Sequence, residues 1–149
     1  MSKLIEYLLK RNLKIGFAES ITGGALSYNF VKNEGASKYF KGSIICYSNS
    51  IKTDVLSVSK ETIEKHGVVS NKVSEELAFG IKKILNLDVA ISVTGNVEKN
   101  GIVFFSVLFN EKVFTNKILM PYINRKKNIN HIVDEITDKS TSILYNCFT

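Results

Sequence analysis

The chain has 149 residues, of which 44% are hydrophobic and 23% are charged, and its formal net charge is +6 at pH 7. This length and composition predict one globular domain over residues 1–149 and exclude a fibrous or low-complexity protein. Most of the positive charge is lysine spread along the chain, which is typical of a solvated surface rather than of a clustered nucleic-acid site. A nucleic-acid binder therefore remains an alternative that rests on net charge alone.

Several compositional features narrow the protein class. No apolar run approaches the roughly 20 residues of a membrane-spanning helix, and the N-terminus lacks the apolar stretch of a signal peptide. We therefore expect a cytoplasmic protein with no membrane partner. Cys46 and Cys147 lie far apart and are expected to be free thiols. His66 and His131 have no second ligand at a metal-binding spacing, so the sequence predicts no metal.

The first half of the chain alternates between helical and strand patterns. Helical spacing of apolar residues predicts helices over residues 3–11, 22–33, 49–57 and 60–66. Buried strands are expected over residues 13–19 and 40–48. Ser20 or Thr22 is the expected N-cap of the second helix, and its inner face would carry Leu26, Phe30 and Val31.

The second half predicts one helix, three strands and a long final helix. Ser70 is the expected N-cap of a helix with an apolar stripe of Val73, Leu77, Ile81, Ile84 and Leu85. Strands are expected over residues 88–95, 102–110 and 112–120, with a hairpin around Asn110 and Glu111. The final helix would be lined by Ile129, Ile132, Val133, Ile136, Ile143, Leu144 and Cys147. Interleaved helices and strands with a late hairpin predict a three-layer α/β/α sandwich with a mixed sheet.

The stretch AESITGG, residues 18–24, follows the first expected strand and leads into a helix. A helix start offers unpaired N–H groups and a positive dipole end, and Gly23 and Gly24 would let a phosphate or oxyanion approach the backbone. Ser20 would then be a nucleophile, with the N–H groups as an oxyanion hole. The alternative is structural: Ser20 or Thr22 caps the helix, and the glycines ease packing.

Tyr47, Ser48 and Lys52 follow the second expected strand. If a helix starts near Ser48, then Ser48 and Lys52 share one face at a spacing of four residues. A lysine acts as a base only where burial or a neighbouring cation lowers its pKa, and beside Ser20 it would activate that hydroxyl. The alternative is a capping residue with a solvent-facing lysine.

Two further positions carry chemistry that a ligand could use. Thr94 and Gly95 end a buried strand, where they form either a pocket wall or a turn. Arg125 is one of only two arginines and starts the final helix, where its guanidinium would bind a phosphate or simply face solvent. Ligands in open α/β sheets bind beyond the carboxyl ends of strands, which is where these segments are expected.

Taken in chain order, these motifs resemble the CinA C-terminal domain family, which includes the stand-alone nicotinamide-nucleotide amidases (PncC). The matching segments are AESITGG at 18–24, YSNSIK at 47–52, HGVVS at 66–70 and VTG at 93–95. The resemblance extends over nearly the whole chain. Family members usually have Cys in place of Ile21, a long Gly/Pro-rich loop in place of residues 96–101, and a second arginine in place of Ile129.

The resemblance implies hydrolysis of the carboxamide of nicotinamide mononucleotide to nicotinate mononucleotide and ammonia. It also implies an α/β/α fold that needs no metal or cofactor, acts on a small nucleotide and forms a homodimer. By position, Ser20 is the candidate nucleophile, and Tyr47 and Lys52 are candidate acid/base groups. The residues that would bind substrate are Thr22, Gly23, Gly24, Ser48, Thr94, Gly95 and Arg125.

The short segment over residues 96–101 leaves a second interpretation open. If the family's longer loop forms part of the pocket, this chain lacks one wall. The chain would then be a catalytically inactive relative that binds a nucleotide or a protein partner.

Overall fold

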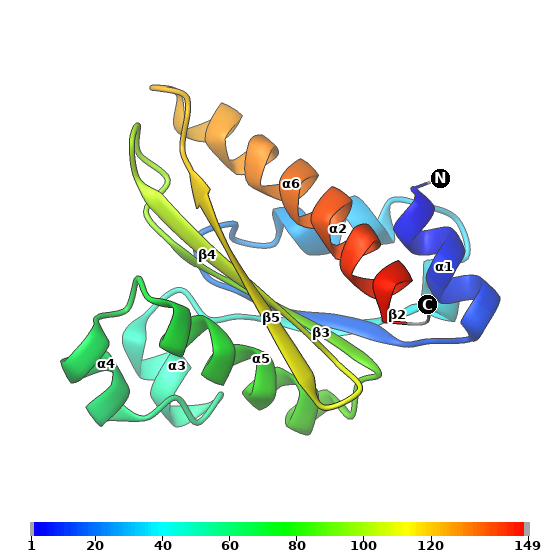
Figure 1. The fold of residues 1–149 in the computed structure, drawn as a ribbon, viewed down its shortest axis with the longest axis horizontal. Coiled ribbons are helices and arrows are strands. Elements are labelled where there is room, and N and C mark those ends of the chain that lie inside the picture. Colours follow the sequence, from blue (N-terminus) through cyan, green and yellow to red (C-terminus); the bar gives the residue numbers. More distant parts are fainter. Residues whose placement is uncertain (1, 148–149) are drawn as a thin grey trace.

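The computed structural model describes residues 2–147, which form a five-stranded sheet covered by helices on both faces (Figure 1). The strands are β1 (Ile15–Glu19), β2 (Phe40–Ile45), β3 (Val89–Gly95), β4 (Ile102–Phe109) and β5 (Lys112–Leu119). The helices are α1 (Lys3–Arg11), α2 (Ala25–Val31), η1 (Ala36–Lys38), α3 (Asn49–Asp54), α4 (Lys60–His66), α5 (Asn71–Leu85) and α6 (Arg125–Asn146). Helices α1, α2 and α6 lie on one face of the sheet and α3, α4 and α5 on the other, which confirms the predicted three-layer sandwich.

The sheet is mixed, as predicted. Its strand order is β2-β1-β3-β4-β5. Strand β1 pairs in parallel with β2 and β3, whereas β3, β4 and β5 pair antiparallel. The three parallel strands therefore finish at the same end of the sheet, on the left in Figure 1, and there β4 begins and β5 ends. We call this end the candidate edge, because ligands in such sheets bind beyond the carboxyl ends of the strands.

The two faces of the sheet bury separate apolar clusters. Under α1, α2 and α6 the cluster includes Phe17 of β1 and Phe30 of α2, whose rings pack edge to face with centroids 4.8 Å apart. Under α5 the cluster includes Leu77 and Ile81. Strands β1 and β3 are buried along almost their whole length, which explains why their sequences are nearly continuous apolar runs.

Two predictions about inward-facing residues are wrong. Val31 is 46% exposed, because α2 rests on the sheet through Leu26 and Phe30 and Val31 is turned about 100° further around the helix. Ile84 is 48% exposed, because the buried face of α5 is centred on a different set of residues, namely Ser74, Leu77, Ala78 and Ile81. Small and polar residues thus extend the buried face beyond the apolar stripe.

Ser74 belongs to a row of buried hydroxyls between α5 and the sheet. Its Oγ lies 2.7 Å from Ser106 Oγ on β4, and Ser106 Oγ lies 2.7 Å from Thr115 Oγ1 on β5. Ser92 on β3 donates to the backbone carbonyl of Ser74. Because each hydroxyl is hydrogen-bonded, the row crosses three strands without leaving these groups unsatisfied, and it fixes α5 against the sheet.

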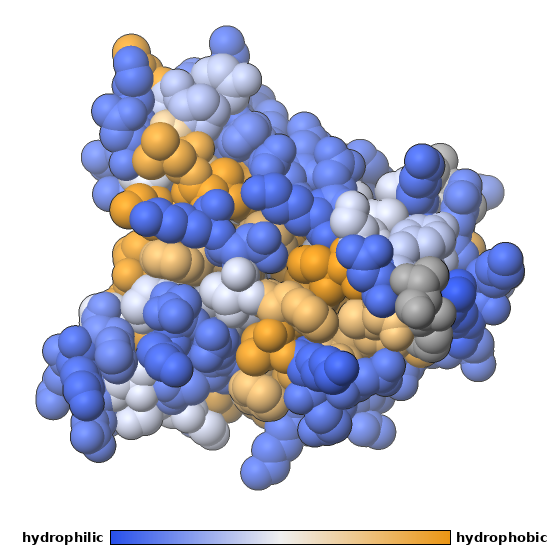
Figure 2. All heavy atoms as spheres, in the orientation of Figure 1, coloured by the Kyte–Doolittle hydropathy of each residue, from blue (hydrophilic) through white to orange (hydrophobic). Residues whose placement is uncertain are grey.

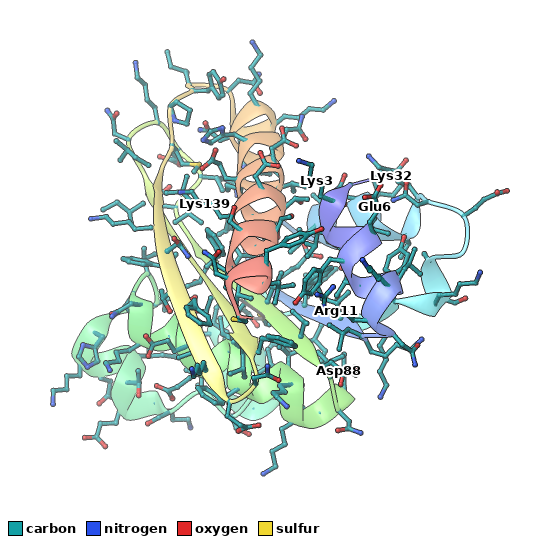
Figure 3. The ribbon with its side chains drawn as sticks, turned by 45° about the vertical axis from the view of Figure 1, so that its right-hand side comes forward. Lys3, Glu6, Arg11, Lys32, Asp88 and Lys139 are labelled. Carbon is teal, nitrogen blue, oxygen red and sulfur yellow. The ribbon has the colours of Figure 1, made fainter. Side chains whose placement is uncertain are left out.

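At the opposite end of the sheet, a hydrogen bond and a tight turn connect neighbouring strands. The carboxylate of Asp88, labelled in Figure 3, accepts from the N–H of Lys14 at 2.8 Å and joins the starts of β1 and β3. The β4–β5 hairpin turns at Asn110 and Glu111, as predicted, and both residues have positive φ. Strand β5 is an outer strand, and apolar residues gather over it in the middle of the face shown in Figure 2.

Both cysteines are free, and Cys46 is fully buried, as expected. Among residues 2–147, none of the helices combines the length and the apolar character that crossing a bilayer requires.

Candidate functional site

The candidate edge brings the predicted segments together. Residues 20–24, which we call the Ser20 turn, follow β1, and Cys46 and Tyr47 lead from β2 into α3. Strand β1 aligns Glu19 with Ile45 of β2 and with Val93 of β3, so these segments leave the sheet side by side. Because β5 also ends here, α6 begins at the same edge (Figure 1).

The buried carboxylate of Glu19 organises the Ser20 turn. It accepts from Thr22 Oγ1 at 2.6 Å, from the N–H groups of Leu26 and Ser27 at 2.9 Å, and from the Ser27 hydroxyl. Glu19 has no exposed surface, and these donors together with the positive end of α2 compensate for its desolvation. The carboxylate therefore holds the start of α2 in place.

This arrangement corrects the predicted cap of the second helix. The helix begins at Ala25 and its N-cap is Gly24, which has no side chain to donate or accept, so neither Ser20 nor Thr22 caps it. Glu19 supplies the acceptors instead, from the end of the preceding strand. No role was predicted for Glu19, although an acid at the end of a buried strand, a few residues before a helix with no acid in its first turn, is a signal for it.

Ser20 differs from its neighbours because its hydroxyl is uncommitted. The residue is 3% exposed, and its backbone N–H donates to Val93 O on β3 at 3.1 Å. Within residues 2–147, Ser20 Oγ has no hydrogen-bond partner, and neither have the N–H groups of Ile21, Thr22 and Gly24. The free donors thus belong to the turn itself, whereas the first N–H groups of α2, which the sequence suggested for an anion, are already bound to Glu19.

Both glycines of the Ser20 turn have positive φ, 57° for Gly23 and 105° for Gly24. A Cβ built on Gly23 meets no atom within 4 Å, so the backbone there is open to an approaching group. Gly24 lies closer to β2, because its Cβ would come within 3.4 Å of Ile45. The pair allows the left-handed turn that these two positions adopt.

Lys52 on α3 is buried, with 1% of its surface exposed. Its Nζ donates to the backbone carbonyls of Cys46 at 2.8 Å and Tyr47 at 3.1 Å. Burial lowers the pKa of this ammonium below its ordinary value, because desolvation disfavours the charged form. The solvent-facing alternative for Lys52 is therefore wrong, and a lysine with a lowered pKa lies beside the backbone that follows β2.

Ser48 does not share a face with Lys52. It is exposed and is the N-cap of α3, accepting from Ile51 N–H at 3.4 Å. Its backbone is extended, with φ −84° and ψ 153°, so helical spacing does not extend back to it. This is the capping alternative that the sequence left open.

Tyr47 and Arg125 meet at the rim of the candidate edge. Tyr47 is 63% exposed, and its hydroxyl accepts from Arg125 Nη2 at 3.5 Å. Arg125 is the first residue of α6, as predicted. The two side chains come from segments far apart in sequence, so the fold places a cation and a phenol together at the surface.

Thr94 and Gly95 form a structural corner. Thr94 is 1% exposed and donates to Val68 O at 3.2 Å, which ties β3 to the connection before α5. A Cβ on Gly95 would come within 2.6 Å of Ile102 O and of Val103 Cα, so only glycine allows β4 to return this closely.

Residues 96–101, which we call the 96–101 turn, close this side of the edge. The turn is compact, with Gly101 N–H donating to Glu98 O at 2.8 Å and Asn100 at a φ of 63°. Buried Asn128 of α6 donates to Val97 O at 2.7 Å. Asn128 was not predictable from the sequence, because a single polar residue in a helical pattern carries no spacing signal.

One hollow close to the candidate edge does not include Ser20. A groove of about 340 Å³ lies between α3 and α4, lined by Asn49, Ser50, Thr53, Asp54, Lys60, Ile63 and Glu64. It includes part of the YSNSIK segment but neither Ser20 nor Lys52. Over residues 2–147 no three His, Cys, Asp or Glu side chains gather as metal ligands would.

Comparison with known proteins agrees with this fold. A relative from Petrotoga mobilis, named CinA-like protein, is 43% identical over 122 residues, which is 76% of this chain and 30% of the relative. Protein MG115 from Mycoplasma genitalium is 35% identical over 142 residues, which is 91% of this chain and 90% of that protein. The chain therefore spans less than a third of the length of the Petrotoga relative but nearly all of MG115.

Solved structures show the same architecture. A competence-damaged protein (CinA) superfamily protein from Enterobacter cloacae is 26% identical, with a TM-score of 0.90 over 95% of this chain and 88% of that chain. A competence damage-inducible protein A from Klebsiella pneumoniae shares the fold, at 22% identity and a TM-score of 0.92 over 96% of this chain and 93% of that chain. The family model of the CinA C-terminal domain matches residues 1–140, and the chain therefore belongs to this family.

Proposed function

We propose that this chain is an amidohydrolase that releases ammonia from the carboxamide of nicotinamide mononucleotide. The proposal rests on the unpaired polar groups of the Ser20 turn. There, a nearly buried serine hydroxyl without a partner in the described residues belongs to the same short turn as three backbone N–H groups that are also free. Nucleophilic attack on a carboxamide requires such a hydroxyl, and the tetrahedral oxyanion requires such donors.

The proposed reaction has two steps. Ser20 Oγ bonds to the carboxamide carbon, its proton passes to a base, and the N–H groups of the Ser20 turn bind the oxyanion. The C–N bond then breaks, and ammonia leaves with that proton. Water next attacks the acyl-serine ester, which gives nicotinate mononucleotide and restores the Ser20 hydroxyl.

Lys52 is the proposed base, because burial lowers its pKa and so raises the share of the neutral amine. No hydrogen bond joins its Nζ to Ser20 Oγ in the described residues, because the ammonium donates to Cys46 O and Tyr47 O. The proposed proton transfer therefore passes through water or through the bound substrate. We assign Arg125, whose guanidinium donates to the Tyr47 hydroxyl at the rim, to the phosphate of the nucleotide, together with Tyr47.

A catalytically inactive binding domain is the second candidate function. Two observations favour it: the carbonyls of Cys46 and Tyr47 already hold the Lys52 ammonium, and the 96–101 turn offers only a short wall. Such a domain would bind the mononucleotide without turnover.

A nucleic-acid role has less support from the surface. Figure 3 shows Lys3, Lys32 and Lys139 on or beside three different helices, with Glu6 close to Lys3 on α1. Lys139 also pairs with Glu135 at 3.3 Å. Positive charge that is dispersed and partly paired does not form the continuous basic patch that a nucleic-acid backbone requires.

One assay separates these functions. Ammonia release is measured with nicotinamide mononucleotide, nicotinamide riboside and nicotinamide at equal concentrations. The amidase proposal expects release from the mononucleotide and much less from the other two compounds, because these lack the phosphate. Saturable binding of the mononucleotide with no ammonia would favour the inactive domain, and absence of both would contradict both candidates.

The expected homodimer is also a proposal, motivated by the family resemblance. Multi-angle light scattering of the purified chain, across a tenfold range of concentration, tests it. A mass near twice 16.7 kDa is expected, and a constant mass of one chain would contradict it.

A further inference from the structure

Asn128 of α6 is buried and polar, and it joins two segments that flank the candidate edge. Its Nδ2 donates to Val97 O and to Tyr122 O, both at 2.7 Å. Its Oδ1 accepts from the N–H of Tyr122 at 2.9 Å. Both amide donors and one face of the carbonyl are therefore used, and no other uncharged side chain except Gln offers this combination of donors and acceptor.

We propose that Asn128 is a positioning residue, which fastens the 96–101 turn to the segment before α6 and thereby sets the place of Arg125. The effect on substrate rests on the proposed function, because Arg125 is there assigned to the phosphate. Asn128 itself contacts backbone and is not a catalytic residue.

The 96–101 turn and the segment before α6 have few other restraints. The 96–101 turn bonds to the end of β5 through Asn100 N–H to Met120 O at 3.0 Å and Met120 N–H to Gly101 O at 2.9 Å. Beyond Met120, residues 121–127 are all exposed. Within this exposed stretch, Tyr122 is held by its two hydrogen bonds to Asn128 and by the edge-to-face contact of its ring with His131, whose centroid lies 6.1 Å away.

The link to Arg125 runs along the backbone. Arg125 follows Tyr122 by three residues, and Asn128 follows Arg125 by three. The N–H of Asn128 also donates to the carbonyl of Asn124, the N-cap, at 3.1 Å. Residues 122–128 thus form a ring closed by the Asn128 side chain, and Arg125 stands at its middle, facing Tyr47. Opening the ring would move the guanidinium away from Tyr47.

The wild-type protein provides the first test, by hydrogen exchange resolved at single amides. The N–H of Tyr122 should exchange at least about 100-fold more slowly than that of Ile123, which has no hydrogen-bond partner in the described residues. Equal exchange at the two amides would overturn the proposal. This exchange measurement needs neither a variant nor enzymatic activity.

Two variants provide the second test. Asn128→Leu keeps the branched shape and removes every hydrogen bond, whereas Asn128→Asp keeps the shape and places acceptors against two carbonyls. Asn130→Asp, at an exposed position on the same helix, is the matched control. We expect both Asn128 variants to raise KM for the mononucleotide about tenfold or more with kcat changed less than threefold, and the control to leave both unchanged.

The aspartate variant adds a readout that loss of packing would not produce. A protonated carboxyl has one O–H donor, so lowering the pH should restore part of the exchange protection at Tyr122 in Asn128→Asp but not in Asn128→Leu. Unchanged KM and unchanged protection in Asn128→Leu would overturn the proposal. If the wild-type protein releases no ammonia, the proposed function fails, while the exchange measurements still decide the role of Asn128.

Discussion

The two sides of the candidate edge hold their backbone in different ways. On the β1–β2 side, two buried ions do so: the Glu19 carboxylate binds the start of α2, and the Lys52 ammonium binds the end of β2. On the β4–β5 side, the neutral amide of Asn128 joins two loops. A buried ion is more costly to leave unpaired than a buried neutral amide. Under the proposed function, the first side carries the chemistry and the second side positions Arg125.

The largest effect on stability is expected at Glu19. Glu19→Ala leaves the Thr22 hydroxyl and the N–H groups of Leu26 and Ser27 without their acceptor, in a buried site. We expect the free energy of unfolding to fall by about 3 kcal/mol or more, measured by urea denaturation. Glu34→Ala, at an exposed loop position, should change it by less than about 0.5 kcal/mol. A loss at Glu19 no larger than this control would refute the carboxylate's structural role.

Lys52 should matter more for activity than for stability. Lys52→Met keeps a long apolar stem and removes the ammonium that the proposed reaction uses as its base. Ammonia release from the mononucleotide should fall about 100-fold or more, while circular dichroism shows a folded chain. Lys60→Met removes one exposed lysine from the neighbouring α4 and serves as the control. Activity in Lys52→Met within threefold of the control would exclude this base.

The lowered pKa of Lys52 also predicts a dependence of stability on pH. Burial lowers the pKa in the folded state, so between that value and the ordinary 10.5 the unfolded chain binds more protons than the folded one. Stability contributed by this residue therefore rises with pH across that window. The difference in unfolding free energy between wild type and Lys52→Met should shift in favour of wild type as the pH rises. A difference that stays flat up to pH 10.5 would argue against a lowered pKa.

The smallest effect is expected far from the candidate edge, at the β4–β5 hairpin. Glu111 has a φ of 63°, so Glu111→Gly should stabilise the chain by about 0.5 kcal/mol, measured as a rise in the denaturation midpoint. The ion pair lost with it, to Lys82 at 3.9 Å, is long and exposed. Asn110→Ala should act in the opposite direction, because alanine tolerates positive φ less well than asparagine. Ammonia release should be unchanged in both variants, since this turn lies at the other end of the sheet.

Much of the fold was predictable because it depends on local patterns. Buried apolar runs marked β1 and β3, Ser70 marked the start of α5, and Asn110 with Glu111 marked the hairpin. The errors come from contacts between elements. Val31 and Ile84 were assigned inward from their own helices, whereas exposure depends on where each helix rests on the sheet.

The candidate site was predictable as a location but not as a set of interactions. Strand ends located the Ser20 turn, α3 and Gly95 at one edge. The acceptor for α2 was not predictable, because Glu19 reaches across the turn to residues seven and eight positions later. The same holds for Asn128, which contacts Val97 across 31 positions. Such bonds between distant positions leave no periodic trace in a single sequence.

The central claim, that Ser20 is the nucleophile of an amidase, has one direct test. Wild type and Ser20→Ala are compared for ammonia release from nicotinamide mononucleotide, with urea denaturation of both proteins in the same buffer. We predict that release falls at least about 1,000-fold, because no other group supplies the attacking oxygen. The free energy of unfolding should change by less than about 1 kcal/mol, because the Ser20 hydroxyl has no partner to lose in the described residues. Undiminished ammonia release from a folded Ser20→Ala protein would contradict the account.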